Sequence, residues 1–195
     1  MGIRRARKAD TDDLYAVCLG TGADGTDASD LYDDPRLLGE VFVGPYLRHS
    51  PDFAWAYADA DDRARGYVLG VLDTTSFENV LATAWWPVLR ARHPLVPETA
   101  NPHDREMVEY LHHPQRRPAS LLEAYPSHLH IDMLPDVQGA AEAAGCWAPC
   151  WTPSPRPGRP ASISGSRPRT SAPSASMSIS GSRWSPPPRA LMSSS

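Results

Sequence analysis

Acidic residues disappear from this chain after Glu142. Residues 1–142 hold all 23 Asp and Glu residues and 13 of the 19 Lys and Arg residues. The stretch that follows consists largely of Ser, Pro and Arg and has few large apolar residues, so burial cannot offset the entropy that it would lose on folding. The sequence therefore predicts a folded domain in residues 1–139 and a disordered Ser/Pro/Arg-rich tail in residues 140–195.

The apolar residues needed for a core are concentrated in the same first part. Trp55, Trp85, Trp86 and the Val, Leu and Ile runs all precede residue 136. A domain of this length can bury one sizeable core. We therefore expect a single domain in which Trp85 and Trp86 are core residues.

The net charge, the hydrophobic runs and the cysteine spacing indicate which kinds of partner the chain can bind. The folded part is acidic, whereas binding to nucleic acid needs clustered Lys and Arg. No apolar run approaches the roughly 18 residues that span a bilayer, and no basic and apolar leader precedes Ile3. The three Cys residues lack the spacing of a disulfide or zinc framework. We expect a cytoplasmic protein without a nucleic-acid, membrane or metal partner.

Hydrophobic spacing predicts both strands and helices. Period-two spacing predicts the strands, two of which form an antiparallel hairpin, and 3.6-residue spacing predicts the helices. Asp10 is expected to be the N-cap of the first helix, and Gly44-Pro45 to interrupt the second. The expected order is strand 2–6, helix 10–19, helix 35–47, strands 53–58 and 66–73, helix 74–92, helix 103–112 and strand 128–134. This order indicates an α/β fold with a mixed α+β sheet.

Three segments resemble the GNAT family of acyltransferases. They are the opening Ile3-Arg-Arg-Ala6 with the Asp-rich segment that follows it, the strand Gly66-Tyr-Val-Leu-Gly70, and His130-Ile-Asp-Met-Leu-Pro-Asp-Val-Gln-Gly139. More narrowly, Gly66–Thr74, Trp85-Trp86-Pro87 and Tyr125–Asp132 resemble a bacterial subgroup similar to the acetyltransferase-like domain attached to O-GlcNAc hydrolases. The resemblance covers about residues 3–139 and implies an incomplete GNAT acyl-CoA N-acyltransferase fold.

The resemblance also implies acetyl-CoA as the acyl donor. In the family, the backbone of the fourth strand pairs with the pantetheine arm, and a Gln/Arg-x-x-Gly-x-Gly/Ala loop at a helix N-terminus holds the pyrophosphate. By this resemblance the acetyl-CoA-binding residues are Met133, Leu134, Val137, Gln138 and Gly139. Residues 140–143 depart from the loop pattern, and Glu142 would place a carboxylate against the phosphates. We therefore expect weakened acetyl-CoA binding.

The composition of the tail favours a shifted reading frame. One Lys among 19 basic residues indicates a GC-rich coding sequence, in which a slipped frame yields peptide rich in Arg, Pro, Ser and Ala. Reading one base out of register from Gln138 restores a Gly-rich loop, an amphipathic helix and the family's Asn-x-x-Ala-x-x-Phe-Tyr segment. The alternative is a genuine Ser/Pro-rich disordered tail.

Candidate catalytic residues lie on the strand 128–134. Asp132 follows His130 and His128 at two-residue steps, so all three share one face, which can supply the proton acceptor that N-acetyl transfer needs. We take Asp132 as the catalytic candidate. The same pattern also fits a polar strand face beside a cleft or solvent, or a metal site that lacks a defined fourth donor. Asp73 fits either the border of an acceptor pocket or a helix cap.

Three functions are compatible with these features. The first is a GNAT-type acyltransferase that moves acetyl from acetyl-CoA to a small-molecule or peptide amine acceptor, impaired here by loss of the pyrophosphate loop. The alternative is a non-catalytic pseudo-acetyltransferase that serves as a binding module, and the third is a small metal-dependent hydrolase. If later strands and the following helix are missing, the apolar side chains of Leu129, Ile131 and Met133 are expected to lie open to water.

Overall fold

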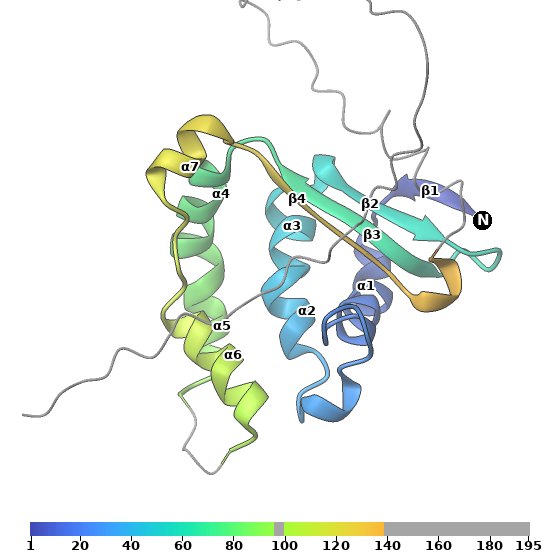
Figure 1. Cartoon of the computed structure of the whole chain (residues 1–195), viewed down its shortest axis with the longest axis horizontal. Helices are drawn as coiled ribbons and strands as arrows, with labels where there is room; N and C mark the ends of the chain where they lie inside the picture. The colour runs from blue at the N-terminus through green and yellow to red at the C-terminus, as the bar shows by residue number, and fades with distance from the viewer. Residues whose placement is uncertain (96–99, 139–195) are drawn as a thin grey trace, which may run out of the picture. The chain divides into compact units, whose positions relative to one another are not determined.

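A four-stranded antiparallel sheet organises the chain. The computed structural model describes residues 1–95 and 100–138. Within them the strands pair in the order β1-β2-β3-β4, and β2 and β3 form the expected hairpin (Figure 1). The strands are β1 (Gly2–Arg5), β2 (Ala54–Ala58), β3 (Ala64–Val71) and β4 (His128–Met133). The combination of this sheet with helices confirms the expected mixed α+β class.

Helices α1, α2 and α3 form the first helical group, on one face of the sheet (Figure 1). α1 (Thr11–Gly20) and α3 (Gly44–His49) contact β3, and α2 (Leu37–Phe42) packs against α1. The β3 side chains that face them are Tyr67, Leu69 and Val71, all of them buried. α1 begins after Asp10, which holds the expected N-cap position, although its side chain makes no capping hydrogen bond to α1. The break between α2 and α3 falls at Val43, beside the expected Gly44-Pro45, which confirms that prediction.

A second group of helices lies between β3 and β4 in the sequence. It comprises α4 (Thr74–Val80), the π-helical turn η4 (Leu81–Trp85), α5 (Trp86–Arg92), α6 (Pro102–His112) and α7 (Ala119–Ala124). α6 contacts α2, and the Glu40 carboxylate of α2, 5% exposed as a residue, accepts hydrogen bonds from Arg92 and His93 at the end of α5. The Trp85 indole N–H donates to the Glu40 carbonyl. This buried acidic residue therefore joins the second group to the first.

Residues 74–92 are helical throughout, as expected, but the helix contains the π-helical turn η4. The turn η4 separates α4 from α5, and a π turn inserts one extra residue into the helical repeat. The four-residue spacing of Phe77 and Leu81 therefore does not extend to Trp85, and the buried position moves to Trp86. Pro87 has no N–H to donate to the preceding turn, which favours an interruption at this point. Trp86 is a core residue as expected, whereas Trp85 is half-buried.

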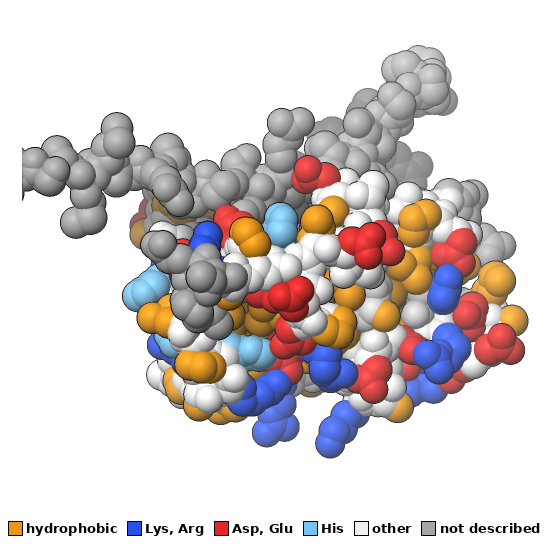
Figure 2. Space-filling view, turned by 90° about the horizontal axis from the view of Figure 1, so that it is seen from below, with side chains coloured by type: hydrophobic (Ala, Val, Ile, Leu, Met, Phe, Trp, Pro, Cys, Tyr) orange, Lys and Arg blue, Asp and Glu red, His pale blue; other side chains and the backbone are white. Residues whose placement is uncertain are grey.

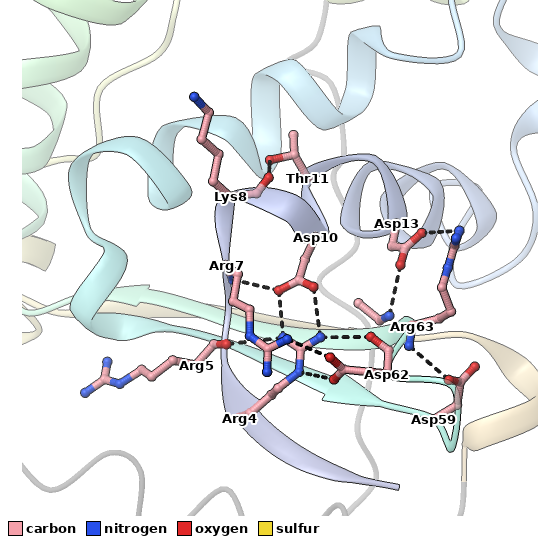
Figure 3. A network of polar contacts seen from close by, with 11 residues as sticks. Arg4, Arg5, Arg7, Lys8, Asp10, Thr11, Asp13, Asp59, Asp62 and Arg63 are labelled. Carbon is pink, nitrogen blue, oxygen red and sulfur yellow. Dashed lines mark hydrogen bonds and ion pairs between the residues drawn. The ribbon is translucent and has the colours of Figure 1, made fainter.

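An ionic network fastens β1 to the start of α1 and to the turn between β2 and β3 (Figure 3). Arg4 donates to both carboxylate oxygens of Asp10 at 2.7 and 2.8 Å, and its Nε donates to Asp62 at 2.6 Å. The backbone N–H of Arg7 donates to Asp10 at 2.6 Å, and its guanidinium to Asp62 at 2.6 Å. Burial alone would raise the pKa of Asp10, but hydrogen bonds from Arg4 and Arg7 outweigh it and leave that pKa lowered. The carboxylate is therefore ionised in the native state.

The surface of the described part is mixed in character. On the face drawn in Figure 2, acidic and basic side chains lie next to one another with apolar side chains between them. The exposed large apolar side chains include Leu129 and Ile131. No helix formed by residues 1–95 and 100–138 has the length and apolarity needed to cross a membrane.

Candidate active site

In the described part of the chain, strand β4 forms one edge of the sheet and β1 forms the other. The Leu134 N–H donates to the Arg65 carbonyl at 3.0 Å, beside the end of β4. In an antiparallel pair, the backbone groups of alternate residues point to the same side. The groups that point to β3 therefore belong to His128, His130 and Asp132, and those that point to the open edge belong to Leu129, Ile131 and Met133.

The open edge carries apolar side chains on the sheet face opposite the first helical group. Leu129 is 44% exposed and Ile131 43% exposed, which confirms the expectation that they lie open to water. Met133 is half-buried, because its side chain lies across Gly66 of β3, where a Cβ would stand only 2.9 Å from Met133 Cγ. In the described part of the chain, the edge thus combines the backbone groups of Leu129 and Ile131, which β3 does not use, with an apolar face.

The residues that the family resemblance assigned to acetyl-CoA are placed unequally. The Gln138 side-chain amide donates to the Met133 carbonyl at 2.7 Å, so these two lie together at the open edge. Leu134 is turned the other way, with its N–H on Arg65 and its side chain packed against the core. Val137 is buried in the short turn η5 (Pro135–Val137). Gly139 lies outside the described residues, and the assignment of all five to acetyl-CoA stays a prediction.

The three polar residues of β4 share the face that lies against the helices. His128 is hydrogen-bonded at both ring nitrogens, with the Tyr46 hydroxyl 2.8 Å from Nε2 and the Thr74 hydroxyl 2.8 Å from Nδ1. The Tyr46 ring also stands edge-on to His130, with centroids 5.3 Å apart. Tyr46 comes from α3 and Thr74 from the start of α4, so both helical groups meet at this histidine.

The hydrogen bonds around His128 define its tautomer. The Thr74 hydroxyl has a single proton, which it donates to the Pro126 carbonyl at 2.8 Å. Thr74 can therefore only accept from His128, so the proton of the ring lies on Nδ1. Nε2 is then a bare acceptor, and the Tyr46 hydroxyl donates to it. The neutral imidazole is fully satisfied in this arrangement.

Burial disfavours a charge on both histidines. It lowers the pKa of His128 to about 3, with smaller contributions from the nearby Arg117 and His130 charges. The pKa of His130 is also lowered by burial, which the Asp132 carboxylate partly opposes. Near neutral pH both rings are uncharged, and His128 cannot be protonated without losing the bond from Tyr46.

The depressed pKa of His128 predicts a loss of stability in mild acid. Above about pH 6.5, the ordinary pKa of His, the imidazole of residue 128 is neutral in both the native and the unfolded state. Between about pH 6.5 and pH 3 it is protonated in the unfolded state but remains neutral in the native state. The free energy of unfolding should fall by up to about 1.4 kcal/mol per pH unit for this one proton. Urea unfolding at several pH values between 7.5 and 5, at about half-unit steps, would measure it.

The matched variant for this experiment is His128→Gln, whose side chain can donate and accept but does not titrate. Its free energy of unfolding should depend less steeply on pH than that of the parent chain, whereas His130 contributes equally to both. Identical slopes in the two proteins would show that His128 titrates normally in the native state.

Asp132 has a different set of neighbours. It is paired in register with Tyr67, whose hydroxyl is within hydrogen-bond reach of both Asp132 and the Cys18 thiol. Burial, followed by the proximity of Cys18 and Asp132, raises the pKa of Tyr67 well above its usual value. Burial also raises the pKa of Cys18 to about 12, so this thiol is not a nucleophile at neutral pH. Asp132 is thus a carboxylate that faces neutral groups.

The structure also bears on the alternatives that the sequence left open. Asp73 accepts a hydrogen bond from the Ser76 N–H at 2.9 Å, so it is the N-cap of α4, as one of the two interpretations predicts. Within residues 1–95 and 100–138, no group of three or more His, Cys, Asp and Glu side chains is placed to hold a metal ion. The polar face of β4 is a partly buried surface under the helices rather than a solvated one.

Sequence reasoning did not anticipate the partners of β4. Tyr46 lies 82 residues from His128 in the chain, and Tyr67 was assigned only to a strand. A usable signal existed for Tyr67 alone, because it shares the inward-facing period of Leu69 and Val71 and carries a hydroxyl that needs a partner when buried.

No protein-family model matches the chain. The Protein O-GlcNAcases of Rattus norvegicus and Mus musculus are each 25% identical to it over 122 residues, which are 62% of this chain. The chain spans only about 13% of the length of those relatives.

A solved structure is more similar. The crystal structure of SsHAT superposes with a TM-score of 0.69 and 33% sequence identity, over 76% of this chain and 74% of SsHAT. SsHAT has the GNAT acetyltransferase fold. An identity of this size over most of both molecules, together with the β4 edge described above, shows that the chain belongs to the GNAT family of acetyltransferases.

Proposed function

We propose that the folded part of this chain is an N-acetyltransferase that moves the acetyl group of acetyl-CoA to an amine acceptor. The observation that supports this proposal is the open edge of β4. There the backbone groups of Leu129 and Ile131 have no partner among the residues that the structure describes. The amide groups of a pantetheine arm can pair with such an edge as an added strand.

Acetyl transfer also needs a group that takes a proton from the acceptor's ammonium. His128 does not fit that role, because Tyr46 and Thr74 occupy both of its ring nitrogens. We assign the role to Asp132, whose carboxylate lies on the same strand as the open edge. The carboxylate takes one proton from the ammonium, and the amine nitrogen then bonds to the acetyl carbonyl carbon. The CoA sulfur leaves with the electron pair of the C–S bond and takes the second proton of the nitrogen, so that the products are the amide and the CoA thiol.

A second candidate function is a binding module that does not transfer acetyl. One observation favours it: the Gln138 side chain already occupies the Met133 carbonyl, which is one of the acceptors at the open edge. An acetyl-CoA molecule that paired along the whole edge would have to displace Gln138. The alternative therefore predicts weak or absent acetyl-CoA binding and no turnover.

A proline at position 131 tests whether acetyl-CoA pairs with this edge. The Ile131→Pro variant lacks the N–H that points to the open edge, while the ladder to β3 keeps its hydrogen bonds. Its affinity for acetyl-CoA should be at least tenfold lower than that of the parent chain, a loss of about 1.4 kcal/mol. Calorimetry, or ligand-observed NMR if binding is weak, would measure the two dissociation constants.

The matched control is Ile131→Val, which keeps the N–H and most of the apolar side chain. Its affinity should equal that of the parent, and all three proteins should have similar thermal midpoints. Equal affinities of the Pro and Val variants would rule out pairing at Ile131. If the 195-residue chain binds no acetyl-CoA at millimolar concentration, the transferase proposal fails for this polypeptide and the binding module is retained.

A further inference from the structure

The second helical group is an addition that the sheet does not require. β3 and β4 are hydrogen-bonded antiparallel neighbours, and such strands can be joined by a turn of two residues. Here residues 72–127 lie between them and supply α4, η4, α5, α6 and α7. The connection between these two adjacent strands is therefore long enough to form a helical substructure of its own.

That segment forms a pocket of ≈ 390 Å³ between α4 and α7. The volume is at the lower end of the range of about 300–1,000 Å³ that is usual for small-molecule sites. Every residue that lines it belongs to the segment between β3 and β4: Thr75, Glu78, Arg116, Arg117, Ala119, Leu122 and Glu123.

The pocket brings together charges of both signs that are not used in the fold. Glu78 and Glu123 supply two carboxylates, and Arg116 and Arg117 supply two guanidinium groups. Among the hydrogen bonds and ion pairs of the described residues, none involves these four side chains. Elsewhere in the described part, arginines such as Arg4, Arg63 and Arg92 are paired with carboxylates. Both pocket acids and both pocket bases are thus available to a ligand.

The pocket is electrostatically connected to the polar face of β4. Burial raises the pKa of Tyr46, an effect that the Arg117 charge opposes and the Glu78 charge reinforces. The pKa of Tyr110 is likewise raised, chiefly by burial, under the same two charges. Thr75, in the pocket wall, directly follows Thr74, which binds His128. Charges in the pocket therefore lie within reach of the cluster beside β4.

We propose that this pocket binds a small amine that also carries an anionic group, such as an amino acid. The carboxylates of Glu78 and Glu123 bind the ammonium group, and the guanidinium groups of Arg116 and Arg117 bind the anion. Arg forms paired hydrogen bonds with a carboxylate, which gives the anionic end a defined orientation. This inference does not depend on the proposed acetyl transfer, because Asp132 is not among the residues that line the pocket.

Three probes of equal chain length test the pocket in the absence of acetyl-CoA. They are 5-aminopentanoate, which has both charges, pentylamine, which has only the cation, and pentanoate, which has only the anion. The doubly charged probe should bind the full chain at least tenfold more tightly than either of the others. Ligand-observed NMR titration would give the three dissociation constants. Equal affinities within threefold, or no binding of any probe, would overturn the proposal.

Variants assign each charge to its end of the ligand. Arg117→Gln should reduce the affinity for 5-aminopentanoate to that for pentylamine, and Glu78→Gln should reduce it to that for pentanoate. The controls are Arg48→Gln and Glu109→Gln, which remove an exposed charge of each sign outside the pocket and should leave all three affinities unchanged. Equal losses in the controls and the pocket variants would show non-specific attraction and refute the site.

The outcomes for binding and for catalysis are separable. Tight binding of the doubly charged probe without release of CoA from acetyl-CoA would retain the pocket and refute acetyl transfer. Transfer of acetyl to an amine without tighter binding of 5-aminopentanoate than of pentylamine and pentanoate would retain the transferase and refute the pocket.

Discussion

The Asp132→Asn variant is expected to lose about 100-fold in kcat for acetyl transfer while its affinity for acetyl-CoA stays unchanged. Asn keeps the size of the side chain and an oxygen that can accept from the Tyr67 hydroxyl, but it cannot take a proton from an ammonium group. The loss should become smaller as the pH rises, because more of the acceptor is then already the free amine. A thiol-detection assay of CoA release from pH 6 to about 9.5 would measure both effects.

A suitable control is His113→Gln, which replaces an exposed residue just after α6. It should leave kcat and the pH profile as they are in the parent. A decrease of less than threefold in the Asn variant would exclude Asp132 as the proton acceptor. A decrease that does not diminish at high pH would assign to Asp132 a purely structural role through Tyr67.

Replacing Asp10 with Ala is expected to lower the free energy of unfolding by about 3 kcal/mol. Asp10 is 5% exposed and accepts hydrogen bonds from the Arg4 side chain and the Arg7 backbone. Its removal leaves the Arg4 guanidinium, whose side chain is only 18% exposed, with Asp62 as its remaining carboxylate partner. Breaking one partner of a buried pair costs more than the pair contributed, because the other charge stays desolvated. Denaturant titration at pH 7 would measure the change.

Asp12 provides the comparison for Asp10. It pairs with Arg36 at 2.7 Å, but the two side chains are 81% and 51% exposed. Surface pairs contribute at most about 1 kcal/mol, so Asp12→Ala should have a small effect. If both variants lost the same free energy, burial would not be what makes the network of Figure 3 important for stability.

The strands could be predicted from the sequence because their signals are local. Strand β2 alternates large and small residues and is followed by a polar turn into β3, and strand β4 places polar and apolar residues on opposite faces. The alternating patterns indicate which side chains of β2 and of β4 share a face, and the polar turn indicates that β2 and β3 pair. The fold class and the shared face of His128, His130 and Asp132 follow from them without knowledge of any distant contact.

The second helical group shows where local signals end. The turn η4 shifts the helical register by one residue, and the spacing of Phe77, Leu81 and Trp85 gives no sign of it. The shift places Trp85 against Gly44, where a Cβ would stand 2.6 Å from the indole ring. α7, six residues long, was not anticipated at all. In both cases contacts with distant residues decide the conformation, and local propensity does not encode them.

The candidate site was predictable only in part for the same reason. Period two places Asp132 on a face, but the identity of its neighbours depends on how α1 and α3 pack on that face. Tyr46 and Thr74 reach His128 from positions 82 and 54 residues away. The charged pocket is formed by side chains from two short helices and the segment between α6 and α7, so it could be recognised only in three dimensions.

The long segment between β3 and β4 also sets the order in which the sheet can assemble. Closing residues 72–127 costs about 3 kcal/mol more chain entropy than closing a two-residue turn. The β2–β3 hairpin does not require this closure, so β1, β2 and β3 can pair early. Strand β4 pairs with β3 only after the helices of residues 72–127 have brought the two ends of that segment together. During that interval β3 is itself an exposed edge, and a chain emerging from the ribosome presents it for as long as His128–Met133 has yet to be synthesised.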